Sequence, residues 1–517
     1  MSTKFYVFIF LLFTGFVLFG SSLNNPFIFD DESQIVKNET IQNFNIAKIF
    51  SESTFNSYGK ENASGIYYKP LLTMTYALLW KIGNGTSLPF HLFQLFLGII
   101  IAFLFYLILS FWISPILAAA MAVLFLVHSI NSEVILYIAN LQDNLYLLWG
   151  LLSLLLIMKN KSWIYIAICL IFSLMSKESG IIFVFAAPVI SFFLNSNNKT
   201  RLILVFTASV IAFGAYSVIR FIIVEMTTLS YTTIPIGKLT WGERLLTFPK
   251  EVFYYIKTFF WPETISLHEN WVVTEFSFSE VIFPLFVSIF VIWCIISMCN
   301  RIQLLKKPLG KIFLILIVLN MGLHSNIFIP LDATVANRWF YVGSLAVIGL
   351  IGLSAEQIIL RYQKSAIVLF LLVFCLLSGR TYLRIQEWKS GISLFTEAVA
   401  TSPNDSNYNN TLGLYYSRAG NLTKAEALFK KSIQLDPASF SAWNNIGTIE
   451  ANRGNYAAAE EYFITAIKNG QYPLAIENYA RLLLVQNRRN DLSHFLKDAI
   501  IVLPKNKLLL ELQSQGY

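Results

Sequence analysis

The sequence predicts an all-α protein, in which a polytopic bundle of membrane-spanning helices is followed by a short tetratricopeptide-repeat (TPR) solenoid. The 517-residue chain is 56% hydrophobic and only 13% charged, far from an average soluble protein. Its apolar residues gather in runs of bilayer length between Met1 and about Arg380. From there to Tyr517 the pattern is that of amphipathic helices with an internal repeat.

About eleven apolar runs approach the roughly 20 residues that a spanning helix needs. They are Phe5–Gly20, Phe90–Trp112, Pro115–His128, Asn140–Met158, Trp163–Met175, Gly180–Leu194, Leu202–Val224, Val281–Cys299, Ile312–Ile329, Phe340–Ser354 and Ala366–Leu377. Several are short, so the expected number is about nine to thirteen.

The basic residues set the expected orientation. With the N-terminus in the cytoplasm, the short cytoplasmic connections carry Lys159, Lys161, Lys199, Arg201, Arg301, Lys306, Lys307, Lys311, Arg361 and Lys364. This is the positive-inside pattern. A nucleic-acid-binding protein would cluster its basic residues on one soluble face, so the net charge of +8 does not indicate a nucleic-acid partner.

Three long segments then fall on the outer side, namely loops 21–89 and 225–280 and the tail. The aromatic stretches Tyr67–Trp80 and Trp241–Trp261 are expected at headgroup level. Long excursions on one side indicate a working face. We expect a catalytic membrane domain at 1–385 and a TPR domain at 386–517. An odd number of spans places the tail in the periplasm of a bacterium (inner membrane) or the lumen of the endoplasmic reticulum, and an even number in the cytosol.

The tail repeats itself with a 34-residue period. The equivalent pairs are Gly413 and Gly447, Gly420 and Gly454, Ala425 and Ala459, and Phe429 and Phe463. This period is typical of TPR hairpins, where small residues let two helices approach and the phenylalanines fill the gap to the next hairpin. A partial repeat precedes this pair around Phe395, and a degenerate one from Tyr472 onward is expected to act as a cap.

Ionisable groups near a bilayer are costly, so those at span ends are candidate site residues. On the expected outer side they are Asp30, Asp31, His128, Glu133, Asp143, Lys177, Glu178 and Arg338. Asp30 and Asp31 directly follow the first span. They suit a general base or a metal ligand, although a solvated turn or a helix cap explains them equally well.

The other candidates also have two interpretations. His128 and Glu133 fit a capped turn between spans, or a carboxylate near an acceptor or metal with His128 in support. Lys177 and Glu178 fit a salt bridge, or a lysine offered to a lipid phosphate. Arg338 fits a snorkelling interfacial arginine or a bidentate phosphate clamp.

Motifs for a soluble donor are absent from the sequence. It contains no P-loop, paired-cysteine metal motif, dinucleotide glycine fingerprint or serine elbow. Any donor is therefore expected to reside in the membrane. Two carboxylates could bind a divalent metal, but acid–base chemistry requires none.

Several segments in a fixed order carry a resemblance to a known family. They are FIFDDESQIVKN (27–38), YYKPLLTMTYALLW (67–80) leading to PFHLFQL (89–95), HSINSEVILYIANLQDNL (128–145), SKESG (176–180), SNIFIPLDATVANRWFY (325–341) and the junction from Trp388 to the tail, followed by the repeats. Nearly the whole chain resembles the transmembrane and tetratricopeptide-repeat O-mannosyltransferases, a branch of the GT-C glycosyltransferases. Asn337 and Ser129 depart from the residues usual in that family, and the repeat array is shorter than in its animal members.

The resemblance implies a polyprenyl-phosphate-linked sugar donor, with mannose expected, and inverting transfer to a hydroxyl such as a protein Ser or Thr. It implies that Asp30 or Asp31 is the base and Glu133 an assisting carboxylate, that Lys177 and Arg338 bind the donor phosphate, and that the TPR domain docks the acceptor. His128, Asp143, Glu178 and Tyr341 would support the site. A non-catalytic TPR scaffold and a transporter of lipid-linked sugars remain alternatives. A transporter would favour charges at mid-span.

Overall fold

A computed structural model describes residues 3–54, 67–195, 197–223, 234–301, 307–470, 472–504 and 506–516. Lys306 and the parts of the outer loops at 55–66 and 224–233 lie outside these residues. The chain divides into two compact units, Met1–Lys389 and Ser390–Tyr517. Both are helical, and the first also contains the two-residue strands β1 (His268–Glu269) and β2 (Val335–Ala336).

Among the described residues, seven helices of the first unit are long and apolar enough to cross a membrane. They are α1 (Thr3–Phe19), α5 (Leu88–Leu109), α8 (Leu141–Met158), α11 (Lys199–Ile223), α13 (Phe283–Arg301), α15 (Tyr341–Arg361) and α16 (Gln363–Glu387). An eighth is formed if α6 (Pro115–Val127) and the segment Ser129–Leu136, bent by 54°, count as one span.

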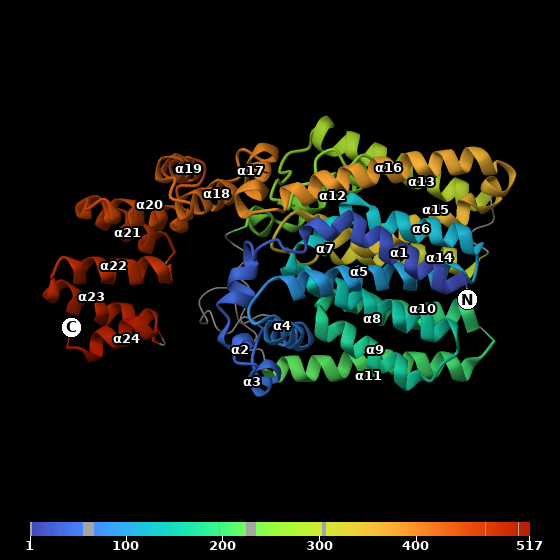
Figure 1. The fold of residues 1–517 in the computed structure, drawn as a ribbon, viewed down its shortest axis with the longest axis horizontal. Helices are drawn as coiled ribbons and strands as arrows, with labels where there is room; N and C mark the ends of the chain where they lie inside the picture. Colours follow the sequence, from blue (N-terminus) through green and yellow to red (C-terminus); the bar gives the residue numbers. More distant parts are fainter. Residues whose placement is uncertain are drawn as a thin grey trace. The chain divides into compact units, whose positions relative to one another are not determined.

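Three apolar helices are shorter than a full span, namely α9 (Trp163–Ser176), α10 (Ile181–Asn195) and α14 (Pro308–Leu323). Each apolar run in the sequence therefore forms a helix, but fewer of these helices reach spanning length than the eleven expected. Within the first unit the long helices run side by side (Figure 1). The predicted all-α fold class is confirmed.

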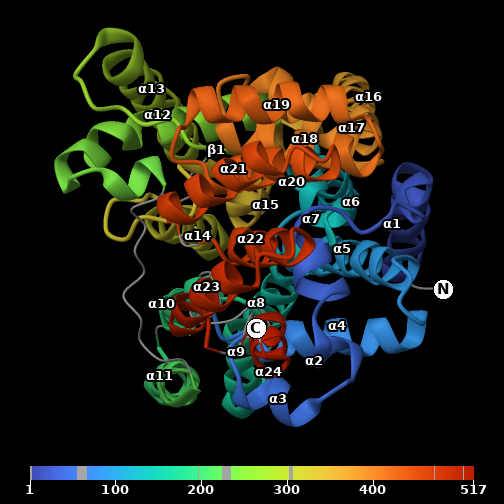
Figure 2. The same ribbon diagram turned by 90° about the vertical axis from the view of Figure 1, so that its left-hand side faces the viewer.

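Short helices of the first outer loop gather at one end of this bundle. They are α2 (Glu39–Gln42), α3 (Ile46–Ser51) and α4 (Pro70–Gly83), which lie together in both views (Figures 1 and 2). Ile41 and Ile49 pack into one buried cluster with Tyr76 and Phe90, so the loop is anchored on α4 and α5. We call this end, which also carries α7 (Ser132–Leu136), the loop end.

The second outer loop contains α12 (Trp241–Phe260), which begins at a capping box formed by Thr240 and Glu243. Trp241 and Phe260 are exposed, whereas Tyr255 is buried against Phe340, with ring centroids 5.1 Å apart. An amphipathic helix with exposed aromatic residues fits the predicted position at headgroup level.

The short basic connections lie at the other end, here called the basic end. Arg201 donates to the carbonyl oxygens of Lys161 and Leu156, so the connection after α8 contacts the start of α11. Glu356 accepts from the Ser114 N–H at 3.1 Å and pairs with Lys307 at 3.5 Å. Residues remote in sequence thus meet at this end, as the alternation of spans predicts.

The second unit is a stack of helical hairpins (Figure 2). Helix α17 (Gly391–Thr401) is followed by the pairs α18 (Ser406–Arg418) and α19 (Leu422–Leu435), α20 (Phe440–Asn452) and α21 (Tyr456–Gly470), and α22 (Pro473–Val485) and α23 (Arg489–Val502), then α24 (Lys507–Ser514). A Cβ atom on Gly413 would lie 2.6 Å from the Phe429 ring, and one on Gly447 2.8 Å from the Phe463 ring. Only glycine permits these approaches, which confirms the predicted repeat.

Candidate functional site

The neighbouring aspartates Asp30 and Asp31, in the turn that follows the first span, lie in different environments. Asp31 is 1% exposed, and its carboxylate accepts from the Ile28 N–H at 3.1 Å and from the Ala139 N–H at 2.8 Å. It gives no side-chain cap to the helix Glu32–Val36, so the helix-cap interpretation is wrong. Asp31 instead fastens the first loop to the segment before α8, with both carboxylate oxygens occupied by backbone donors.

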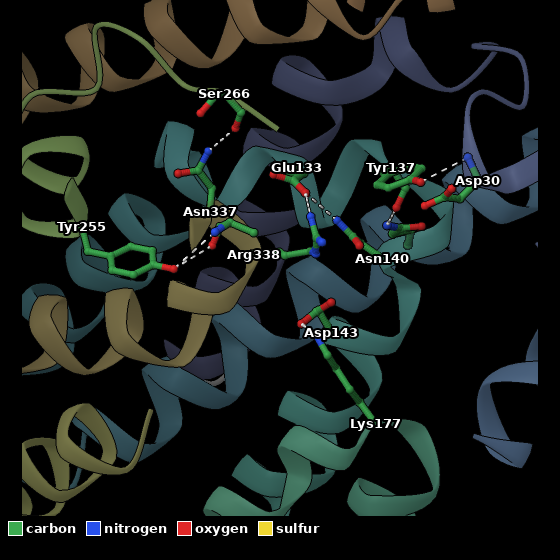
Figure 3. Close-up of polar contacts among 12 residues, drawn as sticks. Asp30, Glu133, Tyr137, Asn140, Asp143, Lys177, Tyr255, Ser266, Asn337 and Arg338 are labelled. Atoms are coloured by element: carbon green, nitrogen blue, oxygen red, sulfur yellow. Dashed lines mark hydrogen bonds and ion pairs between the residues drawn. The ribbon is translucent and has the colours of Figure 1, made fainter. Parts of the chain in front are cut away.

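Asp30 is half-buried, and it contacts Tyr137 (Figure 3). The Asp30 N–H donates to the Tyr137 hydroxyl at 3.3 Å. Burial raises the pKa of the Asp30 carboxyl above its ordinary value, while a hydrogen bond from Tyr137 and the charge of Arg338 lower that pKa in part, and Asp332 raises it. A carboxylate with a raised pKa is a stronger proton acceptor. Burial raises the pKa of Asp31 as well, but the Asp31 carboxylate is buried and both its oxygens accept from backbone N–H groups. Of the two aspartates, the more accessible Asp30 therefore suits the base.

Glu133 and Arg338 form a buried ion pair between α7 and the turn that precedes α15. Glu133 is 1% exposed, and its Oε1 accepts from Arg338 Nη1 at 3.1 Å and from Asn140 Nδ2 at 2.9 Å (Figure 3). Its Oε2 has no hydrogen-bond partner among the described residues. Arg338 is thus held by Glu133 through Nη1, one of the nitrogens that carry the five N–H donors of its guanidinium.

Two further ion pairs connect four segments of the bundle. Lys177 Nζ lies 2.7 Å from Asp143 Oδ1 (Figure 3), while Glu178 lies 3.6 Å from Lys69 Nζ. The interpretation of Lys177 and Glu178 as a mutual salt bridge is therefore wrong. Lys69 also donates to Gln142 Oε1 at 2.9 Å, and burial lowers its pKa while Glu178 opposes that shift.

His128 and Tyr341 each make a polar contact beside these pairs. The Nδ1 atom of His128 accepts from the Ile130 N–H at 3.3 Å, and its ring stacks on Phe259 with a centroid distance of 4.6 Å. The Tyr341 hydroxyl donates to Asn144 Oδ1 at 3.1 Å. Both side chains are buried. Their contacts fix the helices that carry the site.

The segment before Arg338 is tied to the second outer loop. Asn337 Nδ2 donates to the Ser266 carbonyl at 2.5 Å, and its Oδ1 accepts from Tyr254 at 3.1 Å. Strands β1 and β2 pair antiparallel beside these bonds. The orientation of Arg338 thus depends on two loops that are distant in sequence (Figure 3).

Three functional candidates were missed by sequence reasoning: Lys69, Tyr137 and Asp332. All three lie inside segments that carry the family resemblance. Lys69 was assigned to an interfacial aromatic stretch, and Tyr137 lies in the connection between two apolar runs without a role of its own. A single carboxylate in a loop gives no pattern. Their position within these segments is the one signal that could have singled them out.

Among the described residues, no group of three His, Cys, Asp or Glu side chains is arranged to hold a metal ion. A divalent ion bound here would need water or substrate oxygens to complete its coordination, as is common for Mg²⁺. The structure thus leaves Asp30 with two chemical roles, proton acceptance or shared coordination of an ion.

The fold and these contacts define a class: a helical membrane protein with a TPR tail, whose loop end gathers buried ion pairs around a partly exposed carboxylate. The tetratricopeptide repeat model matches residues 376–440 and 410–465. This chain is similar to protein O-mannosyl-transferase F38B6.6 of Caenorhabditis elegans, with 23% identity over 420 residues, covering 78% of this chain and 59% of the relative.

It is also similar to human protein O-mannosyl-transferase TMTC3, with 21% identity over 460 residues, covering 80% of this chain and 49% of the human protein. The predicted resemblance to this family is therefore confirmed. The chain spans about half the length of the curated relatives it matches.

Proposed function

We propose that this protein is a membrane glycosyltransferase that moves a sugar, mannose in the first instance, from a polyprenyl-phosphate carrier to a hydroxyl group of a protein Ser or Thr. The transfer takes place on the periplasmic or lumenal face and inverts the anomeric centre. The names of the relatives support the reaction class. The loop end has a carboxylate that can accept a proton from the acceptor hydroxyl, and cations that can stabilise the phosphate as it leaves. This arrangement supports attack by the hydroxyl on the anomeric carbon and departure of the phosphate.

In this proposal, Asp30 accepts the proton of the acceptor hydroxyl. Asp30 is the partly exposed aspartate of the acidic turn, whereas both carboxylate oxygens of Asp31 accept hydrogen bonds from backbone N–H groups. In the reaction the acceptor oxygen forms a bond to the anomeric carbon and gives its proton to the Asp30 carboxylate. Tyr137 holds this carboxylate in place.

The leaving phosphate is stabilised in this proposal by the positive charges of Arg338, Lys177 and Lys69. Each is ion-paired to a carboxylate, which fixes the position of its positive charge. As the bond between the anomeric carbon and the phosphate oxygen breaks, the polyprenyl phosphate leaves with the electron pair. Positive charge already in place stabilises that developing charge without reorganisation.

The single observation that carries the proposal is the placement of a proton-accepting carboxylate and of anchored cations on one end of the bundle. The test is transfer from radiolabelled polyprenyl-phosphate mannose to Ser/Thr peptides by the full-length protein in nanodiscs. Asp30→Asn should lower transfer by at least about 100-fold, because general base catalysis contributes roughly 10²–10⁴-fold.

Glu275→Gln is the matched control, because Glu275 is an exposed carboxylate of the second outer loop. Its transfer rate should equal that of the unmodified protein. Transfer that persists unchanged in Asp30→Asn would remove Asp30 from the mechanism. An EDTA arm in the same assay tests a divalent ion, and mass spectrometry of the peptide identifies the modified hydroxyl.

A further inference from the structure

Trp388 follows the last residue of α16, and its side chain is 1% exposed. The centroid of its ring lies 5.1 Å from that of the Tyr137 ring, at an interplanar angle of 36°. The guanidinium carbon of Arg384 lies 5.7 Å from the indole centroid. The indole N–H has no hydrogen-bond partner among the described residues. Within that part of the chain, the indole therefore acts through its ring contacts.

Tyr137 connects this ring to the carboxylate of the candidate base. Its hydroxyl accepts from the Asp30 N–H at 3.3 Å (Figure 3), and it also hydrogen-bonds the Asp30 side chain. The ring of Phe29, the residue before Asp30, lies 6.3 Å from the Tyr137 ring. Groups at a reacting centre stay in place when packing fixes the rotamers of the side chains that hold them. The ring of Trp388 is one of the neighbours that fix Tyr137.

The backbone of Trp388 holds the same segment at a second point. Asn25 Nδ2 donates to the Trp388 carbonyl at 3.1 Å. The Asn25 carbonyl in turn accepts from the Ser87 hydroxyl at 2.6 Å, and Asn25 is buried. Asn25 precedes Asp30 by five residues. Trp388 therefore supports the segment of Asp30 twice, through its carbonyl at Asn25 and through its ring at Tyr137.

The end of α16 is itself fixed to other parts of the first unit. The Thr381 hydroxyl donates to the Val127 carbonyl of α6 at 2.7 Å. Arg380 Nε donates to the Pro262 carbonyl of the second outer loop at 2.9 Å. These bonds lie within two turns of Trp388 on the same helix. Trp388 is thus a support whose own position is set by packing.

The rate of proton transfer depends closely on the position of the base, and a displacement of about 1 Å can cost about 100-fold. We propose that Trp388 is a positioning residue for sugar transfer, whose ring holds Tyr137 so that Tyr137 keeps the Asp30 carboxylate directed at the acceptor hydroxyl. This inference rests on the proposed function, in which Asp30 is the base. Trp388 touches neither substrate in this proposal, so its loss should lower kcat and leave both KM values nearly unchanged.

The experiment compares Trp388→Leu, Tyr137→Phe and the double variant as full-length proteins in nanodiscs, with radiolabelled polyprenyl-phosphate mannose and a Ser/Thr peptide. Trp388→Leu should lower kcat about tenfold or more and change each KM by less than about threefold. Tyr137→Phe keeps the ring but lacks the hydroxyl that contacts Asp30, so the position of the ring no longer affects the base. In that background, Trp388→Leu should lower kcat by less than about threefold.

Trp149→Leu is the matched control. The ring of Trp149 packs edge to face against that of Phe172 at 4.9 Å, and its buried indole N–H also lacks a partner among the described residues. Its kcat should stay within about threefold of that of the unmodified protein, whatever its thermal unfolding, because packing alone does not direct the base. Trp388→Phe keeps an aromatic ring and should recover most of the lost kcat. It replaces Trp388→Leu in the comparison if Trp388→Leu does not fold, and its smaller loss should likewise disappear in Tyr137→Phe.

An unchanged kcat in Trp388→Leu, or a loss that multiplies in full with that of Tyr137→Phe, would overturn the inference while the proposed function stands. An equal loss of kcat in Trp149→Leu would also overturn it, because the effect would then be one of packing in general. If the unmodified protein transfers no sugar, the proposed function fails and this inference fails with it.

Discussion

The two ends of the helix bundle both carry charged residues, but they bury them differently. At the basic end, the pair of Lys307 and Glu356 is 3.5 Å long, with side chains 35% and 22% exposed. At the loop end, the side chains of Lys177 and Asp143 are 11% and 0% exposed, and those of Arg338 and Glu133 are 17% and 1% exposed. Positive charge at the basic end is the basis of the predicted orientation. Burial of charge at the loop end costs free energy and therefore makes the loop end the candidate site.

A second contrast concerns which segments each end connects. The pairs of the loop end join α7 to the turn before α15, α8 to the end of α9, and the start of α4 to the connection after α9. Their loss would affect packing and chemistry together. The surface pair of the basic end joins two flanking segments and should affect neither strongly.

The largest expected effect is the loss of Glu133. Glu133→Gln leaves the buried Arg338 without its counter-charge, and breaking a buried pair from one side typically costs about 3–5 kcal/mol. Thermal unfolding in detergent should shift to a clearly lower temperature, and sugar transfer should fall with it. Glu133→Gln that unfolds at the original temperature would show that the pair is unimportant for packing.

The next effect separates the two neighbouring aspartates. Asp31→Asn removes charge from an acceptor of two buried backbone N–H groups, which should destabilise the first unit by about 1.5–3 kcal/mol. Asp30→Asn should leave thermal stability nearly unchanged while lowering transfer by at least about 100-fold. Equal stability losses in the two variants would contradict the division of roles.

How much of this could be predicted from the sequence differs between fold and site. Apolar runs and a 34-residue repeat report local burial directly, so the helices and hairpins lie close to their predicted bounds. The alternation of spans also predicted that the charged span ends share one level. The structure does bring Asp143 to Lys177 and Glu133 to Arg338.

Pairing partners could not be predicted in the same way. The sequence favoured Lys177 with its neighbour Glu178, yet α4 places Lys69 beside Glu178 instead. The difference between Asp30 and Asp31 depends on a tight turn in which Phe29 has φ 55°, and on a contact with Ala139, more than a hundred residues away. These choices follow from tertiary packing, which a local pattern does not encode.

A moderate effect is expected on the pH dependence of transfer. The base must be deprotonated, so the rate rises as pH passes the pKa of Asp30. Burial raises that pKa, and the charge of Asp332 raises it further. The hydrogen bond from Tyr137 and the charge of Arg338 lower it. Tyr137→Phe should therefore raise the pKa and move the acid limb of the kcat/KM profile to higher pH.

The matched control for that shift is Tyr165→Phe, because Tyr165 is exposed on α9. Its acid limb should coincide with that of the unmodified protein. A limb that moves to lower pH in Tyr137→Phe, or does not move, would show that Tyr137 does not stabilise the charged form of the base.

The smallest effect is expected at the basic end. Lys307→Ala removes a half-exposed partner of Glu356, and exposed pairs contribute about 0–1 kcal/mol. Glu356 also keeps its bond from the Ser114 N–H, so thermal unfolding and transfer should both stay close to those of the unmodified protein. A loss of stability and transfer comparable to that of Glu133→Gln would mean that burial of charge does not distinguish the two ends. The argument that the loop end is the site would then fail.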